Sequence, residues 1–298
     1  MDDAGHFPVL LDEVVQHLAP AGRRTIVDCT VGLGGHAEAL LEAAGPAARL
    51  IGVDLDESNL LKTKERLARF GARVRLFEAN FAELEAVLAE AEVASVDAAV
   101  ADLGVSSAQL SDPERGFSFQ LDGPLDMRMR RQGPTAEELV NSGSEAGLAD
   151  LISRYGQERH ARRIARAIVR GRRRERICRT AELARIVAGA VRRARPGRGR
   201  IHPATRTFMA IRIAVNGELE NLQRLLERLP QLLSVGGRAA VISFHSLEDR
   251  LVKRCFAAAA EAGTHRLPTP KPLTPSRDEI ARNPRSRSAK LRTLERIH

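Results

Sequence analysis

Residues 26–41, IVDCTVGLGGHAEALL, decide the fold of this chain. An apolar run ends at Asp28, a glycine-rich loop follows it, and an alanine- and leucine-rich helical pattern begins after the glycines. A strand, a glycine loop and a helix in this order open the nucleotide-binding half of a doubly wound α/β fold. The stretch from Gly32 to Ala37 matches a loose G-x-G-x-x-A form of that fingerprint. Asp54 ends the next apolar run, where an acid that binds a ribose belongs.

Short apolar runs alternate with amphipathic ones from Thr25 to Asp102. Alternating strands and helices imply a parallel sheet with right-handed crossovers. The alternation then stops, and an apolar strand pattern, RAAVISF, returns only at residues 238–244. We therefore expect one Rossmann-like, mostly parallel α/β sheet interrupted by an all-helical domain. Its first part covers residues 1–110, the insertion covers 111–203, and the second part covers 204–298.

The second part carries three further signals. An apolar stripe from Phe208 to Leu229 predicts one long helix. Gly236-Gly237 predicts a turn before the returning strand. SAKLRTLERI, residues 288–297, predicts a strand at the edge of the sheet.

Positive charge is concentrated in the expected insertion. Between Arg154 and Arg200 there are 17 arginines against three glutamates, a local balance of 17 − 3 = +14, whereas the whole chain carries +9. In RHARRIARAIVR, residues 159–170, the apolar side chains share one helical stripe and the arginines lie outside it. A second helix is expected to end at Pro196-Gly197. The arginine face indicates contact with nucleic acid or another anionic surface, and a solvated face is the alternative.

Composition argues against several classes of protein. No stretch is long and apolar enough to span a bilayer, and the acidic N-terminus is unlike a signal or transit peptide, so a cytoplasmic protein that does not bind membranes is expected. The three cysteines, Cys29, Cys178 and Cys255, are far apart and form no CxxC pair. They indicate neither a disulfide framework nor a metal site. Cys178 and Cys255 fall in helical patterns.

Two ligands suit a glycine loop with a ribose-binding acid, a dinucleotide and S-adenosylmethionine. Asp28 precedes the loop and Asp102 ends the fourth apolar run, so both carboxylates are expected at the carboxyl edge of the sheet. A carboxylate there repels the pyrophosphate of a dinucleotide but attracts the sulfonium and ammonium groups of S-adenosylmethionine. The residues alone therefore favour the methyl donor.

Longer motifs then make the chain similar to a known family. HFPVLLDEVV, TVGLGGHAEALL, DLGVSSAQLSDPERGFSFQLDGPLDMRM, ERHARRIARAIV, HPATRTFMAIRIAVNGELE and SFHSLEDRLVKR occur in this order and resemble the RsmH (MraW) family of bacterial rRNA cytosine-N4 methyltransferases. The resemblance covers nearly the whole chain and is weaker only after about residue 264. It implies a class I S-adenosylmethionine-dependent methyltransferase fold. The implied substrate is a cytidine in the P-site region of 16S rRNA within the small ribosomal subunit.

The resemblance also assigns site residues. It implies that Gly34, Gly35 and His36 contact the methionine part of the cofactor and that Asp54 binds the ribose hydroxyls. It places Phe81 beside the adenine and completes the pocket with Asp102 and Gln109. For the RNA we single out the arginine face, above all Arg162, Arg163 and Arg166, with Arg206 as a further candidate.

The implied reaction needs an oriented amine, because the lone pair of the cytosine N4 is conjugated with the ring. Related enzymes often carry a [DNS]-P-P-[YF] motif after the fourth strand, but this chain has Asp102-Leu103-Gly104-Val105 there. Asp102 is our candidate for polarising the amine, with cofactor binding alone as its alternative role, and His245 is the second candidate. Phe117 and Phe119 are candidates for holding a flipped cytosine, or else they anchor the loop. Attack at a ring carbon would need an activated cysteine, and no cysteine is suitably placed.

Two other functions stay open on the sequence. One is an NAD-dependent oxidoreductase, which a thermal shift with NAD rather than S-adenosylmethionine would reveal. The other is a non-catalytic rRNA-binding assembly factor on a methyltransferase-like fold. The chain is expected to act as a monomer or a homodimer.

Overall fold

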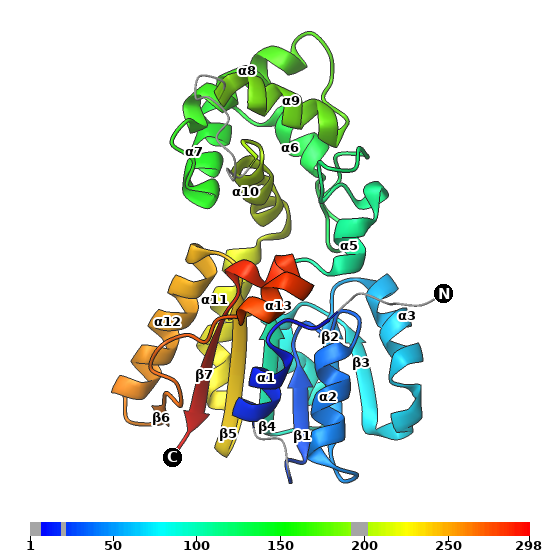
Figure 1. The fold of residues 1–298 in the computed structure, drawn as a ribbon, viewed down its shortest axis with the longest axis vertical. Helices are drawn as coiled ribbons and strands as arrows, with labels where there is room; N and C mark the ends of the chain where they lie inside the picture. Colours follow the sequence, from blue (N-terminus) through cyan, green and yellow to red (C-terminus); the bar gives the residue numbers. More distant parts are fainter. Residues whose placement is uncertain (1–6, 19–21, 192–201) are drawn as a thin grey trace. The chain divides into compact units, whose positions relative to one another are not determined.

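The computed structural model describes residues 7–18, 22–191 and 202–298, which form two compact units (Figure 1). The larger unit contains the chain up to Gly104 and again from Leu219 to His298. The smaller unit runs from Val105 to Glu218. The expected insertion over 111–203 lies within this smaller unit, which also includes helix α10 (Thr205–Asn216). No helix in the described ranges is long and apolar enough to cross a membrane.

The larger unit is built on a mixed seven-stranded sheet with the order β3-β2-β1-β4-β5-β7-β6. Neighbouring strands among β1 to β5 are parallel, and β7 is antiparallel to both β5 and β6. The expected mostly parallel α/β sheet is therefore confirmed. Its strands are β1 (Thr25–Asp28), β2 (Arg49–Asp54), β3 (Val74–Glu78), β4 (Val96–Asp102), β5 (Leu233–Ser243), β6 (His265–Arg266) and β7 (Lys290–Arg296).

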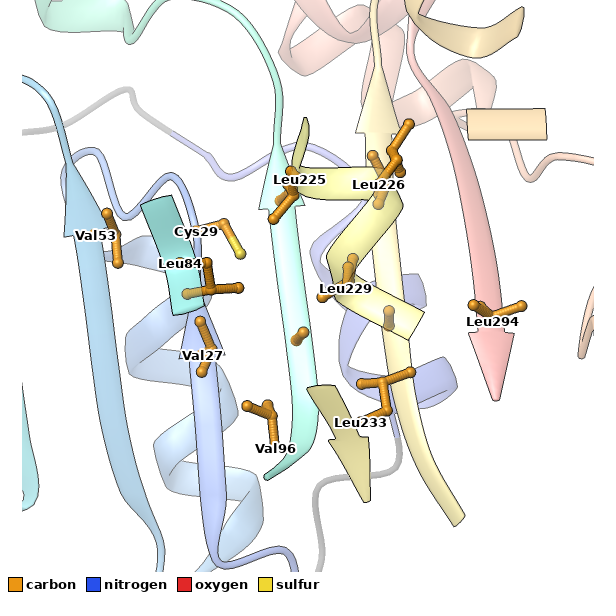
Figure 2. Close-up of a cluster of buried hydrophobic side chains, with 14 of the residues drawn as sticks. Val27, Cys29, Val53, Leu84, Val96, Leu225, Leu226, Leu229, Leu233 and Leu294 are labelled. Carbon is orange, nitrogen blue, oxygen red and sulfur yellow. The ribbon is translucent and has the colours of Figure 1, made fainter. Parts of the chain in front are cut away.

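Helices cover both faces of this sheet because its central strands are apolar on both sides. In β4, Ala98 and Val100 pack on the side of α1 (Leu11–Leu18), α2 (Gly35–Ala44) and α3 (Glu57–Arg66). Ala99 and Ala101 pack on the opposite side. There they meet α4 (Leu84–Glu90), α11 (Glu218–Leu232) and α12 (Ser246–Glu261). Figure 2 shows part of this second core, where Leu225, Leu226 and Leu229 of α11 lie over the strands.

The prediction of a single long helix from Phe208 to Leu229 is wrong. The chain forms two helices, α10 and α11, because Gly217 adopts a left-handed conformation with φ +60° and ends α10. The backbone N–H of Gly217 donates to the carbonyl of Ile213, as in a helix that closes with a left-handed residue. The apolar stripe continues through the break, so the periodicity alone could not reveal it.

The predictions about the strands near the end of the chain also need correction. Gly236-Gly237 is not a turn, because both residues lie within β5. Gly236 has φ +76°, and the pairing with β4 shifts register between Val96 and Ala98. A Cβ atom on Gly237 would lie 2.8 Å from the carbonyl oxygen of Val96, so this irregular strand needs glycine. The strand within SAKLRTLERI exists as β7, but it pairs on both sides, and the short β6 is at the edge instead.

The smaller unit is helical and has its own buried core. It contains α5 (Ser107–Ser111), α6 (Ala136–Ser142), α7 (Glu145–Gly156), α8 (Ala161–Arg172), α9 (Thr180–Val191) and α10. The predicted helix end at Pro196-Gly197 lies outside the described residues. Cys178 lies in the loop before α9 rather than in a helix, whereas Cys255 is in α12 as expected.

Candidate active site

The strand order reverses between β1 and β4, and ligands of open α/β sheets bind at the carboxyl ends of the strands at such a point. Asp28 is the last residue of β1, and Asp102 is the last residue of β4. Thr30 joins the two strand ends. Its backbone N–H donates to Asp28 Oδ1 at 3.1 Å, and its Oγ1 accepts the backbone N–H of Asp102 at 2.7 Å. Both carboxylates therefore lie at the switch point, as the sequence predicted.

The glycine loop forms the next wall of the site and leads directly into α2. Gly34 has φ +80° at the N-cap of α2, and a Cβ atom there would lie 3.0 Å from Thr63 Cγ2. A Cβ atom on Gly35 would lie 2.4 Å from Pro8 Cγ. These contacts explain both glycines structurally. Their expected contact with the cofactor stays a prediction.

Asp54 connects the loop to the end of β2. Its Oδ2 accepts the backbone N–H of Gly32 at 2.8 Å, and its Oδ1 accepts that of Asp56 at 2.8 Å. Asn59 Nδ2 lies 3.4 Å from the same Oδ1. Burial raises the pKa of Asp54 to about 6, against these hydrogen bonds, which lower it. Asp54 thus holds the loop in addition to its predicted bond to a ribose.

Asp102 has an oxygen without a protein partner. Within the part of the chain that the structure describes, buried Asp102 Oδ1 has no hydrogen bond, while Oδ2 lies 3.8 Å from Nδ1 of His36. Burial raises the pKa of Asp102 well above its usual range, and the nearby charges of Asp28 and Glu248 raise it further. A buried acceptor of this kind normally has a partner. Asp102 is therefore the carboxyl in this site that is best prepared to receive a ligand.

His36, at the start of α2, is buried, with 7% of its surface exposed. Its Nε2 lies 2.9 Å from the carbonyl oxygen of Val9, and because a carbonyl only accepts, Nε2 carries a hydrogen. The segment that holds this carbonyl is itself fixed. Leu10 is fully buried at φ +53°, and its backbone N–H donates to Oε1 of Glu279 in α13 (Arg277–Arg282) at 2.8 Å. The N-terminal segment therefore orients the imidazole so that Nδ1 faces Asp102.

The carboxyls at this edge of the sheet repel one another. Burial raises the pKa of Asp28 to about 7, with a smaller contribution from the charge of Asp54. The negative charge of Glu248 helps to raise the pKa of Asp102. Glu248 is buried in the first turn of α12, where its Oε2 accepts the backbone N–H groups of Phe244 and His245 at 2.8 and 3.2 Å. A cationic ligand would relieve this repulsion, whereas an anion would add to it.

The remaining cofactor candidates fall in both units. Phe81 follows β3, is half-buried, and packs against the core on the side of the sheet that α4, α11 and α12 cover. Gln109 belongs to the helical unit, where its Oε1 accepts the backbone N–H of Ser106 at 2.9 Å in the capping box of α5. His245 forms a capping box for α12, with Nδ1 accepting the N–H of Glu248 at 3.3 Å. Cofactor roles for Phe81 and Gln109 stay predictions.

The arginine candidates lie on the helical unit. Arg162, Arg163 and Arg166 are exposed on α8, and the opposite stripe of this helix is buried. Arg166 Nε lies 3.4 Å from Glu145, both of them well exposed, so this ion pair is weak. Arg206 is 55% exposed in the first turn of α10, and its Nη1 lies 3.9 Å from Glu158 Oε2. Phe117 is buried in the core, and Phe119 is half-buried.

Two residues near these candidates were not singled out from the sequence. Glu248 could have been found as the last residue of the pattern His-Ser-Leu-Glu, three positions after the cap residue His245, because this spacing is a helix-capping signal. His202 packs against Phe119, with ring centroids 4.7 Å apart. The histidine of HPATR carried no signal of its own, because its aromatic neighbour is distant in the sequence.

Comparison with known proteins covers the whole chain. A family model described as the MraW methylase family matches residues 3–297. The chain belongs to this family. A ribosomal RNA small subunit methyltransferase H from Geobacter sp. (strain M21) is 49% identical and covers 100% of both chains. Another from Sorangium cellulosum (strain So ce56) is 50% identical over 98% of this chain and 91% of its own.

Membership of the MraW methylase family confirms the resemblance seen in the sequence. With the observed sheet, it confirms a class I methyltransferase fold and S-adenosylmethionine as the cofactor. Among solved structures, an rRNA methylase from Streptococcus thermophilus has a TM-score of 0.45 at 12% identity and covers 97% of this chain and 94% of its own. Family membership does not test the roles of individual residues of this chain, so those roles stay predictions.

Proposed function

We propose that this chain transfers a methyl group from S-adenosylmethionine to the exocyclic N4 of a cytidine in the P-site region of 16S rRNA, acting in the cytoplasm on the small ribosomal subunit. The observation that carries the chemistry is the buried, unpartnered Oδ1 of Asp102 at the switch point of the sheet. The full-length relatives named ribosomal RNA small subunit methyltransferase H support the choice of substrate.

The residues at the sheet edge suit this cofactor. Burial raises the pKa of Asp28, Asp54 and Asp102, and the sulfonium and ammonium groups of the cofactor would favour the ionised forms of these carboxyls, which complement its positive charge. Gly34, Gly35 and His36 would hold its methionine part, Asp54 its ribose, and Phe81 and Gln109 its remaining surface. When bound, the cofactor supplies an electrophilic methyl group.

Asp102 would orient the target amine. The positive charge of the bound cofactor favours the ionised form of Asp102. The carboxylate then accepts an N–H bond from the cytosine N4, which directs the nitrogen lone pair and increases its electron density. Once the nitrogen is methylated, it carries an extra proton, and the same carboxylate can take that proton. A raised pKa suits a group that must hold a proton after the reaction.

His36 would position Asp102. Its Nε2 is committed to the carbonyl of Val9, so the ring presents Nδ1 to Asp102 Oδ2 at 3.8 Å. Protonation of either partner allows a hydrogen bond between them, which would limit rotation of the Asp102 carboxyl. The exposed arginines of α8, and Arg206, would bind rRNA phosphates.

The proposal is tested by methyl transfer to small ribosomal subunits from isotopically labelled S-adenosylmethionine, followed by nucleoside mass spectrometry. Asp102→Asn keeps one acceptor oxygen but cannot hold the proton, so we expect a loss of about 100-fold or more at saturating cofactor. If Asp102 only binds the cofactor, saturation restores the rate. Absence of any methylated cytidine with the folded wild-type chain would overturn the proposal.

Asp97→Asn is the matched control, because Asp97 lies in the same strand and caps the backbone of Arg24 and Thr25 instead. We expect this variant to keep its transfer rate. A thermal shift with S-adenosylmethionine, but none with NAD, separates the proposal from an oxidoreductase.

A further inference from the structure

Three aromatic rings stack within the helical unit. Phe119 and His202 have ring centroids 4.7 Å apart at an interplanar angle of 32°. Phe119 and Phe208 meet edge to face, with centroids 4.9 Å apart and an angle of 68°. Phe208 is buried in the core, Phe119 is half-buried, and His202 is exposed. His202 is therefore the outermost ring of a stack that is anchored in the core.

The orientation of the outer ring is set by the backbone. Nδ1 of His202 accepts the N–H of Ala204 at 3.2 Å, and the carbonyl of His202 accepts the N–H of Thr205 at 3.0 Å, where α10 begins. Because Nδ1 accepts, the hydrogen of the neutral ring is on Nε2. A ring held in this way offers a flat surface and one N–H donor at little cost in conformational entropy.

The charge around this ring favours an anionic partner. Arg206 lies in the first turn of α10, is 55% exposed, and has only loose contacts, at 3.9 Å to Glu158 Oε2 and 3.3 Å to the carbonyl of Gln157. The helical unit that carries this ring also has exposed arginines on α8, among them Arg162, Arg163 and Arg166. A protein partner with an apolar or basic surface fits this environment poorly.

Rings are also scarce in this protein. The chain has no tryptophan and a single tyrosine, and Arg154 lies over that ring, Tyr155, at 5.0 Å. The sequence suggested Phe117 and Phe119 as residues that hold a base. However, Phe117 is buried, and Phe119 has His202 on one side and Phe208 on another. His202 is thus the ring of this group that is free to stack on a ligand.

We propose that His202 is a stacking site for an unpaired nucleobase of the RNA and that Arg206 binds an adjacent phosphate. The proposal deepens the function proposed above and rests on it, because it names a base contact on the helical unit. Every nucleobase has a flat face, so the site discriminates unpaired from paired nucleotides rather than one base from another.

The test uses the full chain and two variants that separate stacking from structure. His202→Asn keeps an acceptor for the N–H of Ala204, as in an Asx turn, but removes the ring. His202→Phe keeps a ring that can pack on Phe119 but loses the acceptor. A stacking role therefore predicts that the Asn variant is impaired and the Phe variant is not, whereas a purely structural role predicts the reverse.

Binding is measured by fluorescence anisotropy with a labelled single-stranded oligoribonucleotide and with a ribose-phosphate strand of the same length that lacks bases. We expect His202→Asn to weaken binding to the first probe by about 5- to 150-fold, the range of one aromatic–base stack. Binding to the abasic strand should be unchanged. Arg206→Gln should weaken binding to both probes and flatten the dependence of log affinity on log salt by about 0.7, the value for one contact with a single strand.

Equal binding of wild type and His202→Asn to the base-containing probe would overturn the proposal, as would an equal loss for both strands. Better binding by His202→Asn than by His202→Phe would assign His202 a structural role instead. Methyl transfer to small subunits by the wild type is measured in parallel. If transfer occurs but His202 has no effect, only the stacking site fails, whereas absence of transfer refutes the proposed function.

Discussion

Replacing Asp28 by Asn should stabilise the protein, and by more as the pH rises. Asp28 is 2% exposed, and burial raises its pKa from 3.8 to about 7 in the folded state. The fold therefore prefers the neutral carboxyl. Stability from this preference is fully present below the unfolded pKa and is lost as the pH rises through the folded pKa. Asn cannot ionise, so the variant avoids this loss.

The magnitude follows from the two pKa values. Each pKa unit corresponds to about 1.4 kcal/mol, so the difference in ionisation of Asp28 between the unfolded and folded states lowers the free energy of unfolding by about 1.5 kcal/mol at about pH 5 and about 4 kcal/mol at about pH 8. Asn retains an acceptor for the N–H of Thr30, and any fixed cost of its amide is the same at both pH values. The difference between variant and wild type should thus grow by about 2 to 3 kcal/mol over this range.

Urea unfolding of both proteins without cofactor, at several pH values, measures this difference. A difference that does not change with pH would refute the argument that Asp28 is a destabilising buried charge. Calorimetry with S-adenosylmethionine then tests why the charge is present: we expect weaker binding by the more stable variant. Tighter or equal binding would show that Asp28 does not serve the cationic ligand.

Three further outcomes are expected. Asp54→Ala should weaken cofactor binding and lower the free energy of unfolding by about 2 to 4 kcal/mol, because it leaves two backbone N–H groups unpaired. Unchanged cofactor affinity in calorimetry would contradict the assignment of Asp54 to the ribose. Three exposed arginines of α8, Arg162, Arg163 and Arg166, can be changed together to Glu. We expect this variant to keep its S-adenosylmethionine affinity, to lose methylation of subunits, and to show a slope of log RNA affinity against log salt that is flatter by up to about 0.9 per lost contact. An unchanged slope would assign these arginines to a solvated surface. The matched control changes three exposed cations of α12, Arg250, Lys253 and Arg254, to Glu. It should have a smaller effect on methylation and on the salt dependence of RNA binding. Replacing all three cysteines by Ser or Ala should retain methyl transfer; its loss in a folded variant that still binds cofactor would point to covalent attack on a ring carbon.

The sheet could be predicted from the sequence because its parallel strands are buried on both faces and read as short apolar runs. The positions of Asp28, Asp54 and Asp102 at the strand ends followed from the same runs. The apolar stripe does not reveal the break at Gly217, since it continues through it, and the only local signal is the Asn216-Gly217 pair. The sequence did not show that β7 has a neighbour on its outer side, because that neighbour, β6, is only two residues long and gives no periodic signal.

The arrangement within the site depends on contacts between distant residues. The orientation of His36 requires the carbonyl of Val9, and the segment around Val9 is held by Glu279, which lies 269 residues after Leu10. Periodicity and local motifs carry no information about such pairs. The capping box that buries Glu248 is local and could have been recognised, but its proximity to Asp102 depends on the pairing of β4 with β5.

The central claim is that this chain methylates N4 of one cytidine of 16S rRNA and that Asp102 is needed for the transfer. The most direct measurement is mass-spectrometric mapping of 16S rRNA from a strain that lacks this chain, complemented with the wild type or with Asp102→Asn. We predict that an N4-methylated cytidine in the P-site region is lost, returns with the wild type, and does not return with the variant. An unchanged pattern of modification in the strain that lacks the chain, or a methyl group restored on a ring carbon, would contradict the account.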